Sequence, residues 1–464
     1  METYIDVAVI GAGISGISAA SHLKKKCPNK SFKIFEKRSA IGGTWDLFKY
    51  PGIRSDSDMF TLGFSFKPWK ERKAIADGPS IMNYLKETVS EHELEENINY
   101  NQSLIKAEWS TEKAIWKITL FNSITNKEEI ISCKFLFMCS GYYSYDKGYT
   151  PEFKGIENFN GSIVHPQKWS EEVDYDNKKV VIIGSGATAV TLVPEIAKKA
   201  SAVTMLQRSP TYIVAYPDED MFSNILKAIL PSKLSYALTR FRNVLVQQWI
   251  YTQCRKFPKY MKKFLLNRIR EYLSDEEIKK NFTPSYNPWE QRMCLVPNGD
   301  FFLSIKENKA SVVTDEISNF TSNSIKLKSG KELDADLIVT ATGLNLKLLG
   351  GVDLIVDGKT VEISSTMTYK SMMFSDVPNF ISTFGYLNAS WTLKADLTSQ
   401  YACRLINLMD KKSYKYCSPK IPSNVEEDKD WLAADFSSGY IQRAKHLFPK
   451  QGNKPPWKNY QNYI

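Results

Sequence analysis

A glycine-rich segment near the start of the chain has the spacing that lets backbone approach a phosphate group. Gly11-Ala12-Gly13-Ile14-Ser15-Gly16 follows a β-rich run at residues 5–10 and precedes a helix-favouring stretch at residues 17–23. In this context Gly11 permits a tight turn, Gly13 allows close approach of a pyrophosphate, and Gly16 allows close helix packing. The N-terminus of the following helix supplies free N–H groups and partial positive charge. The segment therefore predicts a dinucleotide-binding turn.

An acidic residue occupies the position that would contact the ribose of a dinucleotide bound at this turn. A second β-rich run, residues 32–35, ends in Glu36, whose carboxylate can accept hydrogen bonds from both ribose hydroxyls. The same carboxylate repels a 2′-phosphate. This half of the chain is therefore expected to bind FAD.

The pattern recurs in the middle of the chain with one informative change. A strand-like run at residues 179–183 leads into Gly184-Ser185-Gly186-Ala187-Thr188-Ala189, with Ala189 at the packing position, and then into a helix-favouring stretch at residues 190–199. The next predicted strand, residues 202–206, is followed by Gln207-Arg208-Ser209 instead of an acid. A guanidinium favours a 2′-phosphate through charge-assisted hydrogen bonds, so the second turn is expected to bind NADPH.

Two such turns in one chain indicate a flavin that is reduced by a pyridine nucleotide. The seven cysteines form no CxxC pair, which excludes a thiol-type disulfide reductase and favours a reducing compartment. None of the four histidines has metal-ligand spacing. We expect no metal.

These elements predict an α/β fold with two Rossmann-like dinucleotide-binding domains, one for FAD and one for NADPH. Two apolar runs that end in small residues, 134–141 and 334–343, are expected to be the crossings between them. The predicted organisation is a first part of the FAD domain at 1–145, the NADPH domain at 146–335, and a second part of the FAD domain at 336–464. A helical, aromatic and basic stretch at about 222–282 is expected to be a helical insertion in the NADPH domain.

The net charge of +10 raises the question of a polyanionic partner. Because lysines occur along the whole chain among 51 acidic residues, we expect solvated charges and no nucleic-acid partner. A peripheral membrane helix within 222–282 is an alternative to an insertion that packs on the NADPH domain. No apolar run reaches the length of a membrane span, and a strand begins too early for a signal peptide. A cytoplasmic location is expected.

Between the two glycine turns lies the segment Phe159-Asn160-Gly161-Ser162-Ile163-Val164-His165-Pro166-Gln167-Lys168-Trp169. It matches FxGxxxHxxxW and resembles the fingerprint of type I Baeyer–Villiger monooxygenases, of the class B flavoprotein monooxygenase family. Ser170 departs from the Pro or Asp common in that family. The resemblance implies that His165 lies in an interdomain linker and assists domain motion and NADPH use, with Phe159 and Trp169 as packing residues.

Further segments extend the resemblance from residue 5 to about 408. Gly42-Gly43-Thr44-Trp45 and Asp56 resemble the family's longer signature, and residues 207–212 and 287–292 also match. The stretch 385–392, which contains Asn388, is similar to the late FAD-contacting segment of the ethionamide-monooxygenase-like branch. The resemblance implies FAD-site roles for five residues, namely Gly43, Thr44, Trp45, Asp56 and Asn388.

The resemblance also implies a reaction. NADPH would reduce FAD, and a flavin C4a-peroxide formed with O2 would insert one oxygen atom next to a ketone carbonyl, giving an ester or lactone, with sulfoxidation as an accompanying activity. Arg292 would be the active-site cation that stabilises anionic oxygen, and Asp56 would position it. The expected substrate is a small apolar ketone or thioether; its identity and the oligomeric state do not follow from the sequence.

Two other functions stay open at this point. One is an N- or S-oxygenating flavin-containing monooxygenase, in which a protonated hydroperoxide acts on a soft nucleophile. The other is a non-catalytic, redox-responsive flavoprotein that kept both nucleotide sites. Oxygen-dependent NADPH consumption with a ketone would distinguish the last from an enzyme.

Overall fold

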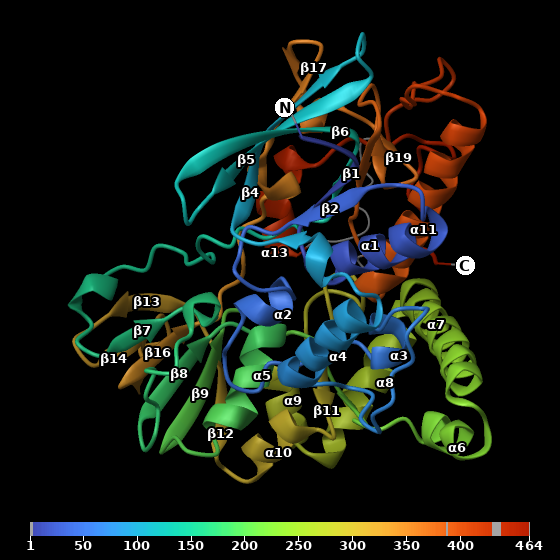
Figure 1. Cartoon of the computed structure of the whole chain (residues 1–464). Coiled ribbons are helices and arrows are strands. Elements are labelled where there is room, and N and C mark those ends of the chain that lie inside the picture. The colour runs from blue at the N-terminus through green and yellow to red at the C-terminus, as the bar shows by residue number, and fades with distance from the viewer. Residues whose placement is uncertain (1–2, 387, 429–437, 464) are drawn as a thin grey trace.

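The computed structural model describes residues 3–386, 388–428 and 438–463. Two sheets lie one above the other, with helices around the lower one and along the side of the upper one (Figure 1). The upper sheet has the order β18-β17-β4-β5-β6-β1-β2-β3, and β21 pairs with β6. Its strands are β1 (Thr3–Ile10), β2 (Phe32–Phe35), β3 (Ile98–Asn99), β4 (Gln102–Ser110), β5 (Ile115–Asn122), β6 (Lys127–Met138), β17 (Asp353–Val356), β18 (Lys359–Thr360) and β21 (Phe380–Ser382).

Strand β1 is an interior strand of this sheet, and both of its neighbours run parallel to it. It pairs with β2 on one side and with β6 on the other, and its apolar run is covered on both faces, as parallel strands require. One face packs against α1 (Ile14–Lys26), α4 (Gly78–Glu91) and α11 (Trp391–Lys411), and the side chains of the other face share a core cluster with those of β4, β5 and β6. The sequence pattern strand, glycine turn, helix is therefore present as expected.

The lower sheet is parallel throughout, with the order β12-β9-β8-β16-β7. Helices α5 and α10 cover one face, and a three-stranded antiparallel sheet packs on the other. The elements of this unit are β7 (Ser162–Val164), β8 (Lys179–Ile183), α5 (Ala187–Ile196), β9 (Ala202–Gln207), α10 (Asp300–Lys306), β12 (Ala310–Thr314), β13 (Ile317–Phe320), β14 (Ser324–Leu327), β15 (Glu332–Asp334) and β16 (Leu337–Thr340).

The position of β16 refines the chain boundary expected at residue 335. Leu337 pairs with Val180 of β8 and with Ser162 of β7, so the lower sheet continues to Thr340. The apolar run at 334–343 is thus a central strand of the lower sheet before it becomes a crossing. The crossing itself begins after Thr340.

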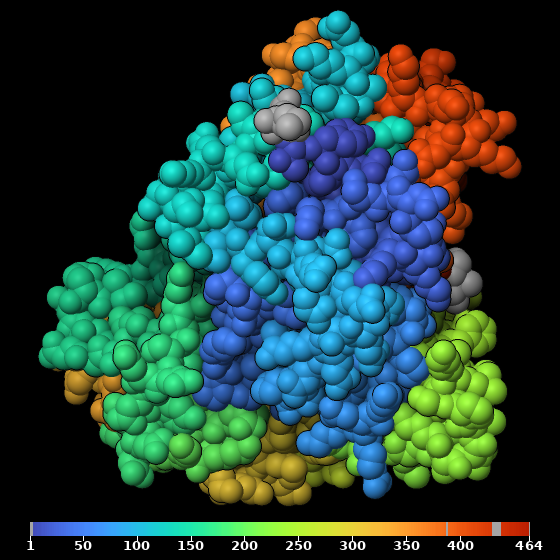
Figure 2. Space-filling model, viewed as in Figure 1, coloured from blue at the N-terminus to red at the C-terminus, as the bar shows by residue number. Residues whose placement is uncertain are grey.

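The stretch between β10 (Ile213–Tyr216) and β11 (Cys294–Pro297) is helical, as expected for the insertion, and the two strands pair in parallel. Its packing differs from the expectation, however. The later helices join the core of the lower sheet, whereas α7 packs against α3 of the upper unit. Figures 1 and 2 show α6 and α7 at one edge of the molecule. The helices are α6 (Met221–Ile229), α7 (Ser232–Lys256), α8 (Pro258–Arg268) and α9 (Asp275–Asn281).

The remaining elements are short. They are α2 (Thr44–Leu47), α3 (Met59–Leu62), α13 (Gly439–Arg443), β19 (Thr368–Tyr369) and β20 (Met373–Phe374). Within residues 3–386, 388–428 and 438–463, none of the helices combines the length and the apolar character that a membrane span requires.

Candidate active site

A cavity of about 1260 Å³ lies between the two sheets and is lined by both glycine turns. Most residues predicted for the site line it, including both halves of the expected catalytic pair. Outside its lining are Gly16, Ala189 and Asn388, together with the four fingerprint residues. The predicted residues that line it are Gly11, Gly13, Glu36, Gly43, Thr44, Trp45, Asp56, Gly184, Gly186, Thr188, Arg208, Ser209 and Arg292.

The first glycine turn, residues 11–16, is packed too closely for side chains. Gly11 has a φ of +104°, and a Cβ added at Gly16 would lie 1.8 Å from the Gly11 carbonyl oxygen. Gly13 faces Gly43, whose Cα would lie 3.6 Å from an added Cβ. Helix α1 begins at this turn without a side-chain cap, so its first N–H groups are directed to the cavity end of the helix. These are the conditions that a pyrophosphate requires.

Glu36 is buried and its two carboxylate oxygens are already engaged. Oε2 accepts from the Ala12 N–H at 2.7 Å and Oε1 from the Arg38 N–H at 2.9 Å. Burial raises the pKa of Glu36, and these two hydrogen bonds offset part of the effect. Each oxygen retains a lone pair for a hydroxyl donor, so the geometry suits a ribose.

The second glycine turn, residues 184–189, has a similar backbone with more room. Gly184 has a φ of +135°, and an added Cβ would lie 2.3 Å from the Ala341 carbonyl oxygen. No atom lies within 4 Å of a Cβ added at Gly186. Helix α5 also begins without a side-chain cap, and Ala189 is fully buried where the first turn has Gly16. A second dinucleotide fits this turn as well.

Arg208 follows β9 at the mouth of the second turn and is exposed. Two acidic residues, Asp315 and Glu316, line the same part of the cavity. A hydrogen bond from Lys328 lowers the pKa of Glu316, with a smaller contribution from Arg208. The anion-binding character of Arg208 is therefore moderated by a neighbouring carboxylate that sequence spacing does not reveal.

Arg292 and Asp56 form an ion pair in the cavity, with Nη2 and Oδ2 2.8 Å apart. They come from distant segments, one before β11 and the other from the loop before α3. The Asp56 carboxylate raises the pKa of Arg292 above its ordinary value, so the guanidinium stays charged at every physiological pH. The structure therefore brings together the cation and carboxylate that the resemblance paired.

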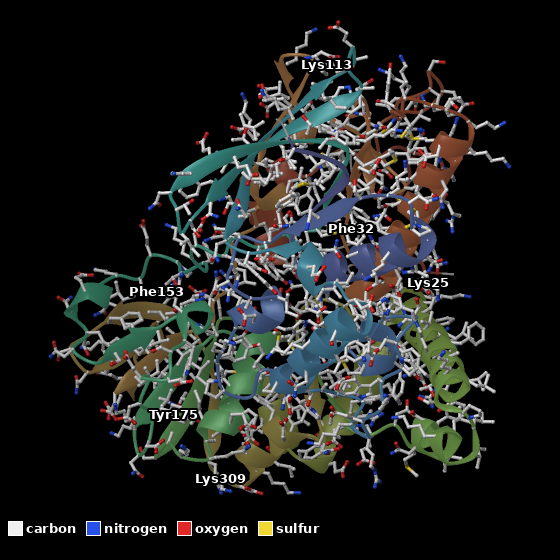
Figure 3. The ribbon with its side chains drawn as sticks, in the orientation of Figure 1. Lys25, Phe32, Lys113, Phe153, Tyr175 and Lys309 are labelled. Atoms are coloured by element: carbon white, nitrogen blue, oxygen red, sulfur yellow. The ribbon has the colours of Figure 1, made fainter. Side chains whose placement is uncertain are left out.

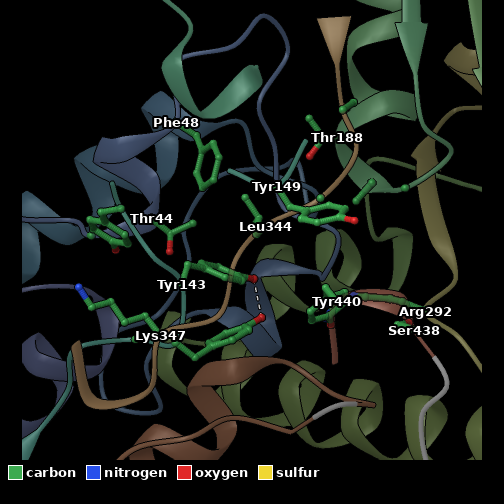
Figure 4. Close-up of a pocket in the computed structure, with 18 of the residues that line it drawn as sticks. Thr44, Phe48, Tyr143, Tyr149, Thr188, Arg292, Leu344, Lys347, Ser438 and Tyr440 are labelled. Carbon is green, nitrogen blue, oxygen red and sulfur yellow. Dashed lines mark hydrogen bonds between the residues drawn. The ribbon is translucent and has the colours of Figure 1, made fainter. Parts of the chain in front are cut away.

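Three tyrosines that the sequence analysis missed surround this cation. Tyr142 and Tyr143 have hydroxyls that are hydrogen-bonded to each other, and Tyr440 approaches from the C-terminal part of the chain (Figure 4). Burial raises the pKa of all three above that of free tyrosine. Tyr142 also stacks on Trp391, with ring centroids 5.0 Å apart. In the sequence, Tyr142 and Tyr143 follow directly after the apolar run 134–141, and this position could have indicated that they lie at the site.

The fingerprint residue His165 joins the two crossings between the units. Its Nε2 donates to the Gly343 carbonyl at 3.1 Å, while Nδ1 accepts from the Gln167 N–H at 3.1 Å. A ring that donates at one nitrogen and accepts at the other is neutral, and burial lowers the pKa of His165 accordingly. The ring also lies against Gly148, where an added Cβ would be 2.0 Å from it. His165 thus lies between the two crossings, and its part in domain motion and NADPH use stays a prediction.

The other fingerprint residues also lie outside the cavity. Phe159 is buried beside Phe320 of the lower unit, and Gly161 has no room for a side chain, because an added Cβ would lie 2.5 Å from the Asp336 carbonyl oxygen. Trp169 packs edge-to-face with Tyr175, with ring centroids 6.1 Å apart. All three are packing positions.

Asn388 is the predicted FAD contact that the structure places beside the cavity and not in its wall. Its side-chain amide donates to the Gln461 carbonyl at 2.8 Å, while its Oδ1 is buried without a partner. Within the described part of the chain, no cluster of His, Cys, Asp or Glu could hold a metal ion.

The comparisons with known proteins agree with this geometry. The chain is 50% identical to the FAD-containing monooxygenase EthA of Mycobacterium tuberculosis, an alignment that covers 100% of this chain and 94% of that protein. It is 48% identical to the probable FAD-binding monooxygenase AlmA of Acinetobacter baylyi, with 100% and 93% covered.

Solved structures show the same fold. The oxidized steroid monooxygenase bound to NADP superposes with a TM-score of 0.75 at 22% identity over 93% of this chain and 89% of the other. Cyclohexanone monooxygenase from Rhodococcus sp. Phi1 bound to NADP+ superposes with a TM-score of 0.74 at 19% identity, over 90% and 87%. The model of the flavin-binding monooxygenase-like family matches residues 5–432. The chain therefore belongs to the flavin-binding monooxygenase-like family.

Proposed function

We propose that this protein is an FAD- and NADPH-dependent monooxygenase of the Baeyer–Villiger type, acting on a small apolar ketone and, as an accompanying activity, on thioethers. The observation that carries the proposal is the Arg292–Asp56 ion pair, at 2.8 Å, in the cavity that both glycine turns line. Relatives named as FAD-containing monooxygenases support the cofactor, and neighbours of the same fold bound to NADP support the reductant.

The cofactor-binding roles follow from the geometry of the two turns. Residues 11–16 with Glu36 would hold FAD, and residues 184–189 with Arg208 would hold NADPH. FAD, once reduced by NADPH, supplies the activation of dioxygen. Charge stabilisation, positioning and the exclusion of water are the roles of the protein's own side chains.

In this proposal Arg292 stabilises negative charge that develops on oxygen during attack on the carbonyl carbon. Its charge is permanent, and a fixed cation in a partly closed cavity needs little reorganisation during the reaction. Asp56 holds the guanidinium in place and reduces its net field. The rings of Tyr142, Tyr143 and Tyr440 limit access of water to the same region.

The test is replacement of the cation. Arg292→Ala should retain bound FAD and NADPH-driven flavin reduction, but lose ketone oxygenation by about 10²–10³-fold, the usual effect of removing one stabilising donor. Product analysis by mass spectrometry with ¹⁸O₂, on linear ketones, cyclic ketones and thioethers, measures this loss. Near-native oxygenation by Arg292→Ala would remove the residue from the proposed role.

A matched control is Arg72→Ala, because Arg72 is a highly exposed arginine that also pairs with a carboxylate, Glu219. It should behave like the unmodified protein. For the location, we propose the cytoplasm, supported by seven free cysteines and by the use of NADPH.

A further inference from the structure

Helix α7 is polar on the side that faces the protein. Arg240 donates to the carbonyls of Phe60 and Gly63 at 2.8 and 2.7 Å and pairs with Asp396 at 3.2 Å. Further along the same face, Asn243 donates to Asp58 at 3.0 Å. In a helix of a water-soluble protein the apolar side normally faces the core. The buried side of α7 is instead largely polar, with Tyr236, Val244 and Cys254 as its less polar members.

The side of α7 that faces away from the protein is apolar. Residues at helical spacing on this side are exposed, with Phe241 and Trp249 each 62% accessible. They are Leu234, Leu238, Phe241, Leu245 and Trp249, separated by four, three, four and four residues. Figure 3 shows side chains of α7 extending outward from the edge of the molecule.

The neighbouring helices extend this apolar surface, which we call the α6–α8 face. Its additional exposed members are Met221, Phe222, Ile225 and Ile229 of α6, Val246 of α7, and Phe257, Tyr260 and Phe264 at and within α8. Half of the large hydrophobic side chains found exposed among the described residues lie in residues 221–264. Because α7 packs against both α6 and α8, these exposed apolar side chains are gathered on neighbouring helices, as at an interaction site.

The charge of the same segment is one-sided. Residues 221–270 hold 11 of the 61 Lys and Arg residues and none of the 51 Asp and Glu residues. The rest of the chain has 50 basic and 51 acidic residues, so the net charge of +10 lies entirely in this segment. The expectation of evenly scattered charge is wrong here. Exposed basic side chains next to the aromatic ones include Arg255, Lys256, Lys259 and Lys263.

We propose that the α6–α8 face binds the surface of an anionic phospholipid membrane, with the helices lying in the plane of the interface. Apolar side chains would enter the boundary of the acyl chains, tryptophan and tyrosine would sit at headgroup level, and lysines and arginines would contact lipid phosphates. The polar inner face keeps α7 attached to the enzyme through Asp58 and Asp396, so the helices need not rearrange.

Charge complementarity selects this partner over two others. A second copy of the chain would bring two segments of the same strong positive charge together, which costs free energy. Nucleic acid would match the charge but leave the apolar side chains without a partner, because protein–DNA interfaces are polar. An anionic lipid surface satisfies both properties at once.

Flotation of the holoenzyme with vesicles tests the proposal without any measurement of oxygenation. The protein should bind vesicles of phosphatidylcholine and phosphatidylglycerol, and bind pure phosphatidylcholine vesicles at least about tenfold more weakly. Leu238→Ser/Phe241→Ser/Trp249→Ser should lose binding to both, while flavin absorbance shows that it is folded.

The matched apolar control is Ile124→Ser/Ile130→Ser/Tyr414→Ser. These residues are also exposed, with accessible fractions of 71%, 44% and 55%, but they lie outside the α6–α8 face. This variant should bind vesicles like the unmodified protein.

The charge is tested separately. Lys256→Glu/Lys259→Glu/Lys263→Glu should reduce binding to the anionic vesicles by roughly tenfold or more, with little change on phosphatidylcholine. A control reversal of exposed lysines elsewhere, Lys113→Glu/Lys117→Glu/Lys359→Glu, changes the net charge equally and should have a much smaller effect.

Three results would overturn the proposal. The first is an unmodified holoenzyme that stays entirely in the fraction without vesicles, and the second is an equal loss of binding in the two charge reversals. The third is a light-scattering result in which the triple serine variant of α7 changes from an oligomer to a monomer without any change in flotation. In that last case the α6–α8 face is an interface between copies.

Discussion

The two glycine turns have the same backbone plan but different surroundings. The first is covered by protein, because Gly13 faces Gly43 and its helix approaches so closely that Gly16 has no space for a methyl group. The second accepts a methyl group at Ala189 and leaves Gly186 with open space. Its charged residue, Arg208, is exposed, whereas the first turn's Glu36 is buried.

Two turns with the same backbone plan can therefore serve two kinds of ligand. A turn enclosed by the protein suits a cofactor that stays through every catalytic cycle, and an open turn suits a reductant that must enter and leave. We therefore expect FAD to dissociate slowly and NADPH to exchange.

Among changes in the two turns, the largest effect should come from Gly16→Ala. The new Cβ would lie 1.8 Å from the Gly11 carbonyl oxygen, and relief of such overpacking costs about 1–3 kcal/mol. If that cost falls on the FAD site, affinity drops by about ten- to hundredfold. The flavin content of purified protein and titration of the apoprotein with FAD measure it.

Gly186→Ala provides the matched comparison in the open turn. It should leave the flavin content unchanged and weaken only NADPH, since its methyl group meets no protein atom within 4 Å. Equal flavin loss in both variants would contradict the distinction between an enclosed and an open turn.

A smaller effect is expected at Arg208. Arg208→Ala should raise the KM for NADPH by about tenfold or more, because a hydrogen bond to a charged group contributes about 1.5–3 kcal/mol. The KM for NADH, which lacks the 2′-phosphate, should change little. Steady-state kinetics with both nucleotides decide the matter, and parallel changes would refute the assignment of Arg208.

A still smaller effect of opposite sign is expected at Glu316. Glu316→Gln removes a negative charge that lines the cavity near Arg208, so the KM for NADPH should fall by about two- to threefold, as for other exposed charge pairs. Glu128→Gln, an exposed change on β6, is the control. An increase in KM would show that Glu316 does not oppose phosphate binding.

The smallest effect concerns the pH dependence of stability at His165. Burial lowers the pKa of His165, so the unfolded chain takes up the proton more readily and stability falls as the pH drops below the ordinary value of about 6.5. His165→Gln should remove part of this fall, about 1–2 °C in Tm. His92, whose pKa burial also lowers, should contribute a further part, and carboxylates with a lowered pKa such as Asp396 contribute at lower pH. If the fall in Tm at low pH is the same in His165→Gln as in the unmodified protein, His165 is not its source.

Much of the architecture could be predicted because it depends on local patterns. The apolar runs before Gly11 and Gly184 are the central parallel strands, and Glu36 and Arg208 follow the next strands as expected. Spacing within one strand–turn–helix unit is a short-range property, so residues alone were sufficient. The pairing of Arg292 with Asp56 is a long-range property, and there only the resemblance was informative.

Other features could not be predicted because they depend on which segments meet. The apolar run that contains Leu337 does not reveal which sheet it joins. The approach of Tyr440 to Tyr142 links the C-terminal part of the chain to the first crossing, which is a long-range contact. The outward apolar stripe of α7 has normal helical spacing. Periodicity shows that two faces differ, but it does not show which one faces the protein.

The two crossings between the units run side by side, and this has a mechanical consequence. Ser144 donates to the Asn345 carbonyl at 2.8 Å, Tyr149 to Gly343 at 3.0 Å, and Lys347 to Tyr142 at 2.9 Å. A paired ribbon of this kind bends across its flat face more easily than it shears, because shear would break the hydrogen bonds that join its strands. The easiest displacement of the lower unit is thus a swing that widens or narrows the gap near Arg208 and leaves the register of the ribbon unchanged.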